Sequence, residues 1–320
     1  MKRSIVSILV VALIQFGCST QEPFYKVTSV EEYLNQMLDY MEQNHINRKS
    51  IDWSSFRQTV QQKGTTAANT DEADESILLA LEMINDQTSF LITRLGEPLT
   101  FSTPCTDTAA PEVIVPDGIG YIKIPTFGNT GVSAAVFAEK MHGEISAQDK
   151  EDLKGWIIDL RGNTGGNMWP MIAGIGPILG NGTAGYFVDS DNVKNAIGYS
   201  DGAAKYDDAA VVAVSFPYTL LSPNSKVAVL MDHATTNAAE AVAITFIGKT
   251  NARSFGPLTC GRAGGNQTFS LSDGSVLYLT VAFLADRNET DQRGQLTPDE
   301  LVDDPAMIFD KAVEWINLPG

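Results

Sequence analysis

Histidine, cysteine and basic residues are scarce in this chain. Its 320 residues include only 3 His and 3 Cys, and 22 Lys and Arg stand against 39 Asp and Glu. The histidines, His45, His142 and His233, do not pair at the spacing of metal ligands, and the acidic residues form no calcium-loop pattern, so no metal site is expected. The formal net charge of −17 excludes the basic face that nucleic-acid binding requires.

The cysteines are too few for a disulfide framework. Cys18 belongs to an N-terminal export signal, which leaves Cys105 and Cys260 in the mature chain. We expect these two to be independent thiols. Pairing is the alternative, because spacing in the sequence does not settle the geometry that a disulfide needs.

The longest apolar run lies at the N-terminus, over residues 5–16, and is too short for a comfortable membrane span. It follows a basic start and predicts an export signal over residues 1–18. The ending LIQFGC resembles a bacterial lipoprotein signal, in which the cysteine, here Cys18, is lipidated and begins the mature chain. Gln15 is unusual for such a signal, so cleavage by an ordinary signal peptidase is the alternative. We expect an exported protein, anchored by this lipid to the membrane of the bacterial cell envelope.

The remaining sequence predicts a small N-terminal helical domain followed by an α/β core. Residues 19–92 carry apolar side chains at helical spacing and a capping box that begins at Ser29. Residues 93–117 contain four prolines and form a connector. Residues 118–320 alternate apolar strands with helices, which is typical of parallel units joined by right-handed crossovers.

The sequence predicts that the core ends in a hairpin and a closing helix. It also contains one polar stretch to which no helix or strand is assigned. The segments of the core are strands at 120–125, 155–160 and 227–231, helices at 133–146, 168–179 and 238–247, a polar stretch at 189–208, a hairpin at 266–283 and a helix at 303–318.

Two of the strands run directly into turns of small and polar residues that open helices. The first turn lies in DLRGNTGGN at residues 159–167, and the second in MDHATTNAAE at residues 231–240. A glycine-rich turn can hold phosphate, but this one lacks both the P-loop and the dinucleotide pattern, so no cofactor is expected. Gly165 and Gly166 suit the backbone donors of an oxyanion hole, although a tight turn alone would account for two glycines.

These turns belong to a set of motifs that together resembles the C-terminal-processing peptidase family, which includes the tail-specific proteases and the tricorn core. The others are SFGPLTCG at 254–261, LSDG at 271–274 and TPD at 297–299, in the family's order. The resemblance implies an α/β fold with a ClpP/crotonase-like core of repeated αββ units behind a small helical domain. Residues 91–117 are too few for the PDZ domain that many members insert, so the chain is similar to the PDZ-less, tricorn-like envelope branch.

The resemblance also implies that the reactive positions are substituted. In the family, the nucleophilic serine lies three residues before the glutamate of the second turn, so the Glu240 register places Asn237 there. The histidine base of tricorn-like members corresponds to Thr88 in NDQTSF, and their acid corresponds to Asp291. The lysine base of other members corresponds to Arg262, which stays protonated.

These substitutions predict that the inherited chemistry is impaired. The amide of Asn237 cannot attack a carbonyl, and Thr88 does not titrate near neutral pH. Because members of a catalytic triad act as a unit, losing two of them removes most of the catalysis. We therefore expect the protein to bind extended polypeptide, such as a protein C-terminus, through backbone donors near Gly165, Gly166 and Ala238 without efficient hydrolysis.

Two other functions stay open. Thr236 and His233 could form a rearranged site in a working serine-type peptidase, although the register of the turn points Asn237 at the cleft. The fold could instead serve to bind a lipid or a glycan, as it does in retinoid-binding members of the family.

Overall fold

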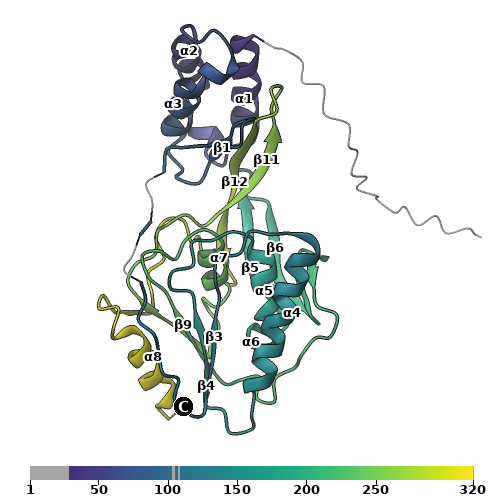
Figure 1. Ribbon diagram of the computed structural model, residues 1–320, viewed down its shortest axis with the longest axis vertical. Coiled ribbons are helices and arrows are strands. Elements are labelled where there is room, and N and C mark those ends of the chain that lie inside the picture. Colours follow the sequence, from purple (N-terminus) through teal and green to yellow (C-terminus); the bar gives the residue numbers. More distant parts are fainter. Residues whose placement is uncertain (1–28, 103–104, 107–108, 320) are drawn as a thin grey trace, which may run out of the picture.

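The protein consists of a helical cap above an α/β body in the computed structural model, which describes residues 29–102, 105–106 and 109–319 (Figure 1). The predicted export signal and its lipidation position, Cys18, lie outside these residues. Within the described ranges, no helix has the length and apolar character needed to cross a membrane.

The cap is built from three short helices, as the sequence predicts. Ser29 caps the first of them, and its hydroxyl accepts the N–H of Glu32 while the Glu32 carboxylate accepts the N–H of Ser29. The third helix ends at Asn85, which adopts a left-handed conformation with φ of 48°. The elements of the cap are α1 (Val30–Asn44), η1 (Arg48–Ser50), α2 (Trp53–Gly64), η2 (Thr70–Glu72) and α3 (Asp74–Ile84).

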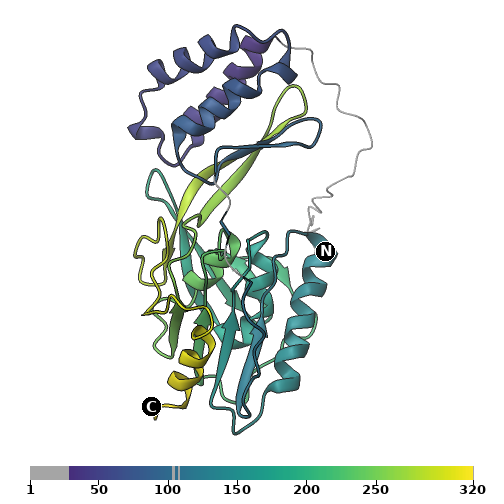
Figure 2. The same ribbon diagram turned by 60° about the vertical axis from the view of Figure 1, so that its left-hand side comes forward.

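A hairpin from the C-terminal part of the chain completes the core of the cap. Its strands are β11 (Gly264–Ser270) and β12 (Val276–Asp286), and they rise from the body into the cap (Figures 1 and 2). Leu277 and Leu279 of β12 are fully buried against the apolar faces of the three helices. The helices therefore do not close a core by themselves, because their apolar surface is covered by a segment nearly 200 residues further along the chain.

The body contains a five-stranded parallel sheet in the order β13-β10-β9-β4-β3, which confirms the expected parallel units. Strand β4, which lies between β9 and β3, is buried throughout, and its successive side chains Ile157 and Ile158 enter different hydrophobic clusters on the two faces. The strands are β3 (Ile119–Lys123), β4 (Gly155–Asp159), β9 (Lys226–Leu230), β10 (Ala252–Gly256) and β13 (Glu300–Leu301).

Helices cover both faces of this sheet. One face packs against the C-terminal helix and the other against the helices that follow β3, β4 and β9 (Figure 1). These helices are α4 (Gly131–Gln148), α5 (Met168–Gly174), α6 (Gly176–Leu179), α7 (Ala238–Ile244) and α8 (Ile308–Asn317).

A second, antiparallel sheet connects the body to the cap. Its order is β2-β1-β12-β5-β6-β7-β8, with β11 paired to β12. The expectation that residues 189–208 carry no regular element is wrong, because β6 and β7 occupy most of this stretch. They are short and composed largely of small and polar residues, so they lack the continuous apolar run of a buried strand. The strands not yet introduced are β1 (Phe90–Ile92), β2 (Pro98–Thr100), β5 (Gly182–Asp189), β6 (Lys194–Ser200), β7 (Ala203–Tyr206) and β8 (Ala209–Ala213).

The two cysteines of the described chain are paired. Cys105 and Cys260 form a disulfide with a Cα–Cα distance of 5.8 Å and a sequence separation of 155 residues. The expectation of independent thiols is therefore corrected. The reason lies in the tertiary structure, which brings the connector beside the turn that follows β10.

Candidate active site

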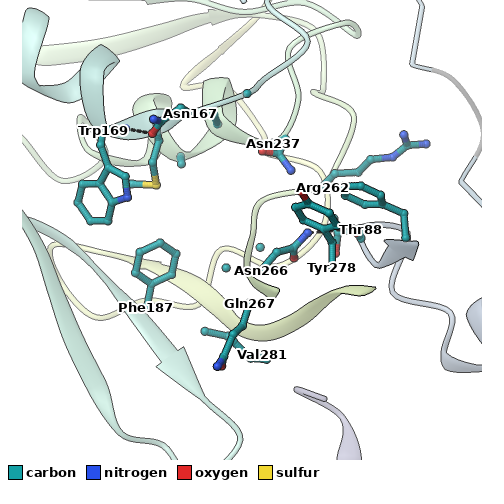
Figure 3. Close-up of a pocket in the computed structure, with 18 of the residues that line it drawn as sticks. Thr88, Asn167, Trp169, Phe187, Asn237, Arg262, Asn266, Gln267, Tyr278 and Val281 are labelled. Carbon is teal, nitrogen blue, oxygen red and sulfur yellow. Dashed lines mark hydrogen bonds between the residues drawn. The ribbon is translucent and has the colours of Figure 1, made fainter. Parts of the chain in front are cut away.

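The second turn, at residues 231–240, holds Asn237 in a strained backbone conformation. Asn237 stands at the N-cap of α7 with φ of 53° and ψ of −115°, a conformation that side-chain-bearing residues rarely adopt. A sharp strand–turn–helix with a strained apex is how hydrolases of several folds expose a nucleophile. The half-buried side chain of Asn237 lines a large cavity between the cap and the body (Figure 3).

A buried carboxylate holds this turn in place. Glu240 is fully buried, and it accepts the backbone N–H groups of Asn237 at 3.0 Å, Gly261 at 2.7 Å and Arg262 at 2.7 Å, together with the hydroxyl of Thr259. Burial raises the pKa of Glu240, and these four donors oppose the shift. One side chain thereby ties the Asn237 turn to residues 259–262, a role that the sequence did not reveal.

The two adjacent glycines of the first turn have different roles. Gly165 is buried with φ of 99°, and a Cβ there would lie 2.8 Å from the Cβ of Asn237. Its N–H donates to Oδ1 of Asn163 at 2.9 Å, so it is not available to a ligand. Gly166, with φ of 112°, is exposed and lines the cavity, and a Cβ there would lie 2.3 Å from the carbonyl oxygen of Phe127. Gly165 therefore serves close packing, and Gly166 faces the ligand space.

Two backbone donors on the cavity wall are left without an acceptor. Among the described residues, neither the N–H of Gly166 nor that of Ala238 donates a hydrogen bond. Both residues line the cavity beside Asn237. Two backbone donors form an oxyanion hole where they converge on one carbonyl oxygen.

The segment at the base position is committed to structural hydrogen bonds. Thr88 lines the same cavity as Asn237, but its hydroxyl bonds the hydroxyl of Thr280 at 2.5 Å. The neighbouring Asp86 accepts Nε2 of the fully buried His45 at 2.8 Å and both the N–H and the hydroxyl of Ser89. Burial alone would raise the pKa of Asp86, but these hydrogen bonds outweigh it and lower the pKa. These hydrogen bonds hold Thr88, Asp86 and Ser89 in one connected polar network beside the cavity.

The remaining sequence candidates do not meet at this site. Asp291 is exposed, pairs with Arg293 at 2.5 Å and is not part of the cavity wall. His233 lines a separate cavity of about 270 Å³, whereas Thr236 lines the large one. Oγ1 of Thr236 is buried and makes no hydrogen bond to any described residue. Thr236 and His233 therefore face different cavities, which does not favour their pairing.

The large cavity has a volume of about 1310 Å³, and its wall combines amide and aromatic side chains with small and hydroxyl-bearing residues. Trp169 and Phe187 lie together on one side, and Thr88, Arg262 and Tyr278 lie on the other, with Asn237 between them (Figure 3). The charged side chains on the described wall are two arginines and one aspartate, Arg48, Arg262 and Asp189. Sequence reasoning missed the aromatic residues, because they come from separate elements and share no motif.

The sequence profile of peptidase family S41 matches residues 118–302, which cover both turns and the Thr-Pro-Asp motif. The chain belongs to peptidase family S41. This result confirms the family and the fold that the motifs predicted.

This S41 chain is similar to proteins of different origin. It is 26% identical over 295 residues to the nisin-resistance protein of Lactococcus lactis subsp. lactis, which covers 90% of this chain and 87% of that protein. The structure of a lipoprotein from Streptococcus agalactiae has a TM-score of 0.70 and 25% identity, covering 90% and 96% of the two chains. The photosystem II D1 C-terminal processing protease shares the fold, with a TM-score of 0.58, 17% identity and coverage of 87% and 94%.

Proposed function

We propose that this S41-family protein binds extended polypeptide in the cavity below the cap and does not hydrolyse it efficiently. The observation that carries the proposal is the strained turn with Asn237 at its apex. The backbone geometry of a nucleophile elbow is present, but the side chain at its tip is an amide.

Backbone groups around the cavity supply the means to hold a peptide. The N–H groups of Gly166 and Ala238 are available to a peptide carbonyl. β11 pairs with β12 on one side only among the described strands, and its residues 264–267 line the cavity. An extended ligand can add to this edge as a further strand, with side chains directed alternately towards and away from the wall.

The same site is poorly equipped for hydrolysis. Asn237 provides no nucleophile, and the hydroxyl of Thr88 is bonded to Thr280. In related triads, the oxyanion hole and substrate binding alone retain only a small part of the rate. Binding with residual or no turnover follows from this combination.

We further propose that the protein is associated with the cell envelope through a lipid on Cys18. The predicted signal sequence supports this location. The relatives named as a nisin-resistance protein and as a lipoprotein agree with it. Labelling with a radioactive or alkyne-tagged fatty acid in a bacterial host tests the anchor, and Cys18→Ser should abolish the label.

The decisive experiment restores the reactive side chains. Native protein should bind a fluorescent unfolded peptide by anisotropy, show no hydrolysis above background and resist a fluorophosphonate probe. Asn237→Ser combined with Thr88→His should gain probe labelling at residue 237 and measurable cleavage. Thr88→His alone is the matched control and should gain neither. Labelling of the native protein that survives Asn237→Ala and maps to another cavity residue would overturn the proposal.

A further inference from the structure

One end of the large cavity differs from the rest in chemistry. Three aromatic rings meet there, those of Trp169, Phe187 and Tyr206. The ring centroids of Trp169 and Phe187 are 6.3 Å apart, and each of them is 6.1 Å from the centroid of Tyr206. The rings are inclined to each other by 40° to 79°, so they do not stack face to face. We call these three rings the aromatic cup.

The aromatic cup is held by ordered elements and remains accessible. Trp169 lies in α5, Phe187 in β5 and Tyr206 at the end of β7. Phe187 lies close to the backbone of β11, because a Cβ on Gly265 would come within 2.8 Å of its ring. Tyr206 is 37% exposed, and all three residues line the cavity. The rings are thus positioned by the fold and also open to a ligand.

A carboxylate stands beside the aromatic cup. Asp189 lies two residues after Phe187 in β5, so both side chains are on the same face of the sheet. Its Oδ1 accepts the N–H groups of Asp191 at 2.8 Å and Val193 at 2.9 Å, which fixes the side chain. Its Oδ2 has no hydrogen bond or ion pair with a described residue. Asp189 is also the single acidic side chain on the described cavity wall.

Aromatic faces next to a carboxylate favour a cation. A cation above the midpoint of three rings at this spacing can lie within ~6 Å of every centroid, the range over which ring quadrupoles attract it. The cation–ring contacts of the described residues involve Trp315, Phe255 and Phe283 instead. No described cation of the protein therefore occupies the cup.

We infer that the aromatic cup and Asp189 form a specificity pocket for a lysine or arginine side chain of the bound polypeptide. The inference rests on the proposed function and names the substrate class of that site. Trp169 and Phe187 of this pocket lie across the cavity from Thr88 and Arg262, with Asn237 between them (Figure 3). It would fix the register of a peptide along the Asn237 turn.

The test uses the full-length mature protein and fluorescein-labelled decapeptides of alanine and serine with a free C-terminus. One position at a time carries lysine, norleucine or glutamate, and binding is measured by anisotropy at ~150 mM salt, where interactions between distant surface charges are screened. At one position or two adjacent ones, lysine should bind ~10-fold more tightly than norleucine, and glutamate should bind most weakly. Asp189→Asn keeps an oxygen for the two backbone donors and should reduce the lysine preference to ~2-fold or less.

The controls separate the outcomes. Asp152→Asn removes the same charge from an exposed residue outside the cavity and should leave the preference unchanged. Equal binding of lysine and norleucine peptides would overturn the inference and leave the proposed function standing. So would a lysine preference of equal size at every position, since that indicates general attraction to the acidic surface. If none of the peptides binds, the proposed function itself fails.

Discussion

The Asn237 turn and the Thr88 segment both line the cavity, but they are held in different ways. At the Asn237 turn, the strained backbone, the Glu240 carboxylate and the close approach of Gly165 form one connected arrangement with an amide side chain at its apex. At the Thr88 segment, the polar groups are bonded to one another through Asp86 and Thr280. The comparison teaches that one buried carboxylate fixes the backbone of the Asn237 turn, whereas the Thr88 segment depends on a network of several polar side chains.

The difference follows from what each part contributes. Backbone donors and buried carboxylates determine the shape of the turn, on which the proposed peptide binding depends. A general base contributes only if its side chain accepts a proton near neutral pH, which a threonine hydroxyl does not do. Under the proposed function, peptide binding and hydrolysis depend on separable features of this site. The following predictions test that separation.

The largest effect should come from removing the carboxylate of Glu240. Glu240→Ala leaves three backbone N–H groups and a hydroxyl without an acceptor in a buried region, which should lower the free energy of unfolding by about 3–5 kcal/mol. Chemical denaturation measures this change. Glu240→Gln retains one acceptor oxygen and should lose less. A loss below about 1 kcal/mol for the alanine variant would mean that Glu240 does not hold the turn.

The next effect tests the packing of the first turn against the second. Gly165→Ala should cost about 2–4 kcal/mol, because its φ is 99° and the new Cβ would press on Asn237 and Thr236. Gly162→Ala is the matched control, since Gly162 also has positive φ, 75°, but no atom lies within 4 Å of a Cβ there. We expect it to cost about 1 kcal/mol. Chemical denaturation measures the free energy of unfolding of both variants. An equal decrease in the two would show that the close approach of Gly165 to Asn237 and Thr236 adds nothing to the cost of its positive φ.

The third prediction concerns the pH dependence of the free energy of unfolding, to which Asp86 in the Thr88 segment contributes. The pKa of Asp86 is lowered in the folded state, so its carboxylate stabilises the protein above the ordinary aspartate range, and this contribution is lost as the pH falls below about 4. Asp86→Asn should cost about 1–3 kcal/mol at pH 7 and flatten the acid side of the stability profile. Parallel profiles for the native and variant proteins would show that another group causes the acid dependence.

The smallest effect concerns the contact between cap and body at the rim of the cavity. Arg48 pairs with Asp191 at 2.5 Å and Lys49 pairs with it at 2.7 Å, and these side chains are partly exposed. Asp191→Asn should change the free energy of unfolding by less than about 1 kcal/mol, and the change should shrink at high salt. Peptide association should become faster if these pairs restrict access to the cavity. An unchanged association rate would limit their role to weak surface stabilisation.

Most of the fold could be predicted from local patterns. The capping box located the start of α1, the apolar runs located β3, β4 and β9, and the Asp-Gly turn located the β11–β12 hairpin. The strands within residues 189–208 were missed, because short strands of small and polar residues do not give a continuous apolar signal. The pairing of Cys105 with Cys260 was missed as well, since no local pattern reports a contact across 155 residues.

The candidate site was predictable only where one motif contains it. Counting back from Glu240 placed Asn237 at the apex of a turn, and the structure gives that residue an apex conformation. The separate roles of Gly165 and Gly166 were not predictable, because adjacent glycines in a turn look alike until their N–H directions are known. Asp291 was matched by spacing alone, and the folded chain directs it to Arg293.

The sequence by itself determined which segments form strands and helices, the family to which they belong, and the chemical identity of the side chain at residue 237. These properties depend on neighbouring residues and on their order along the chain. The tertiary structure alone decided that a C-terminal hairpin closes the core of the N-terminal cap, and that Trp169, Phe187 and Tyr206 gather beside Asp189. Such groupings depend on which distant surfaces become buried together, and burial is a property of the whole folded chain.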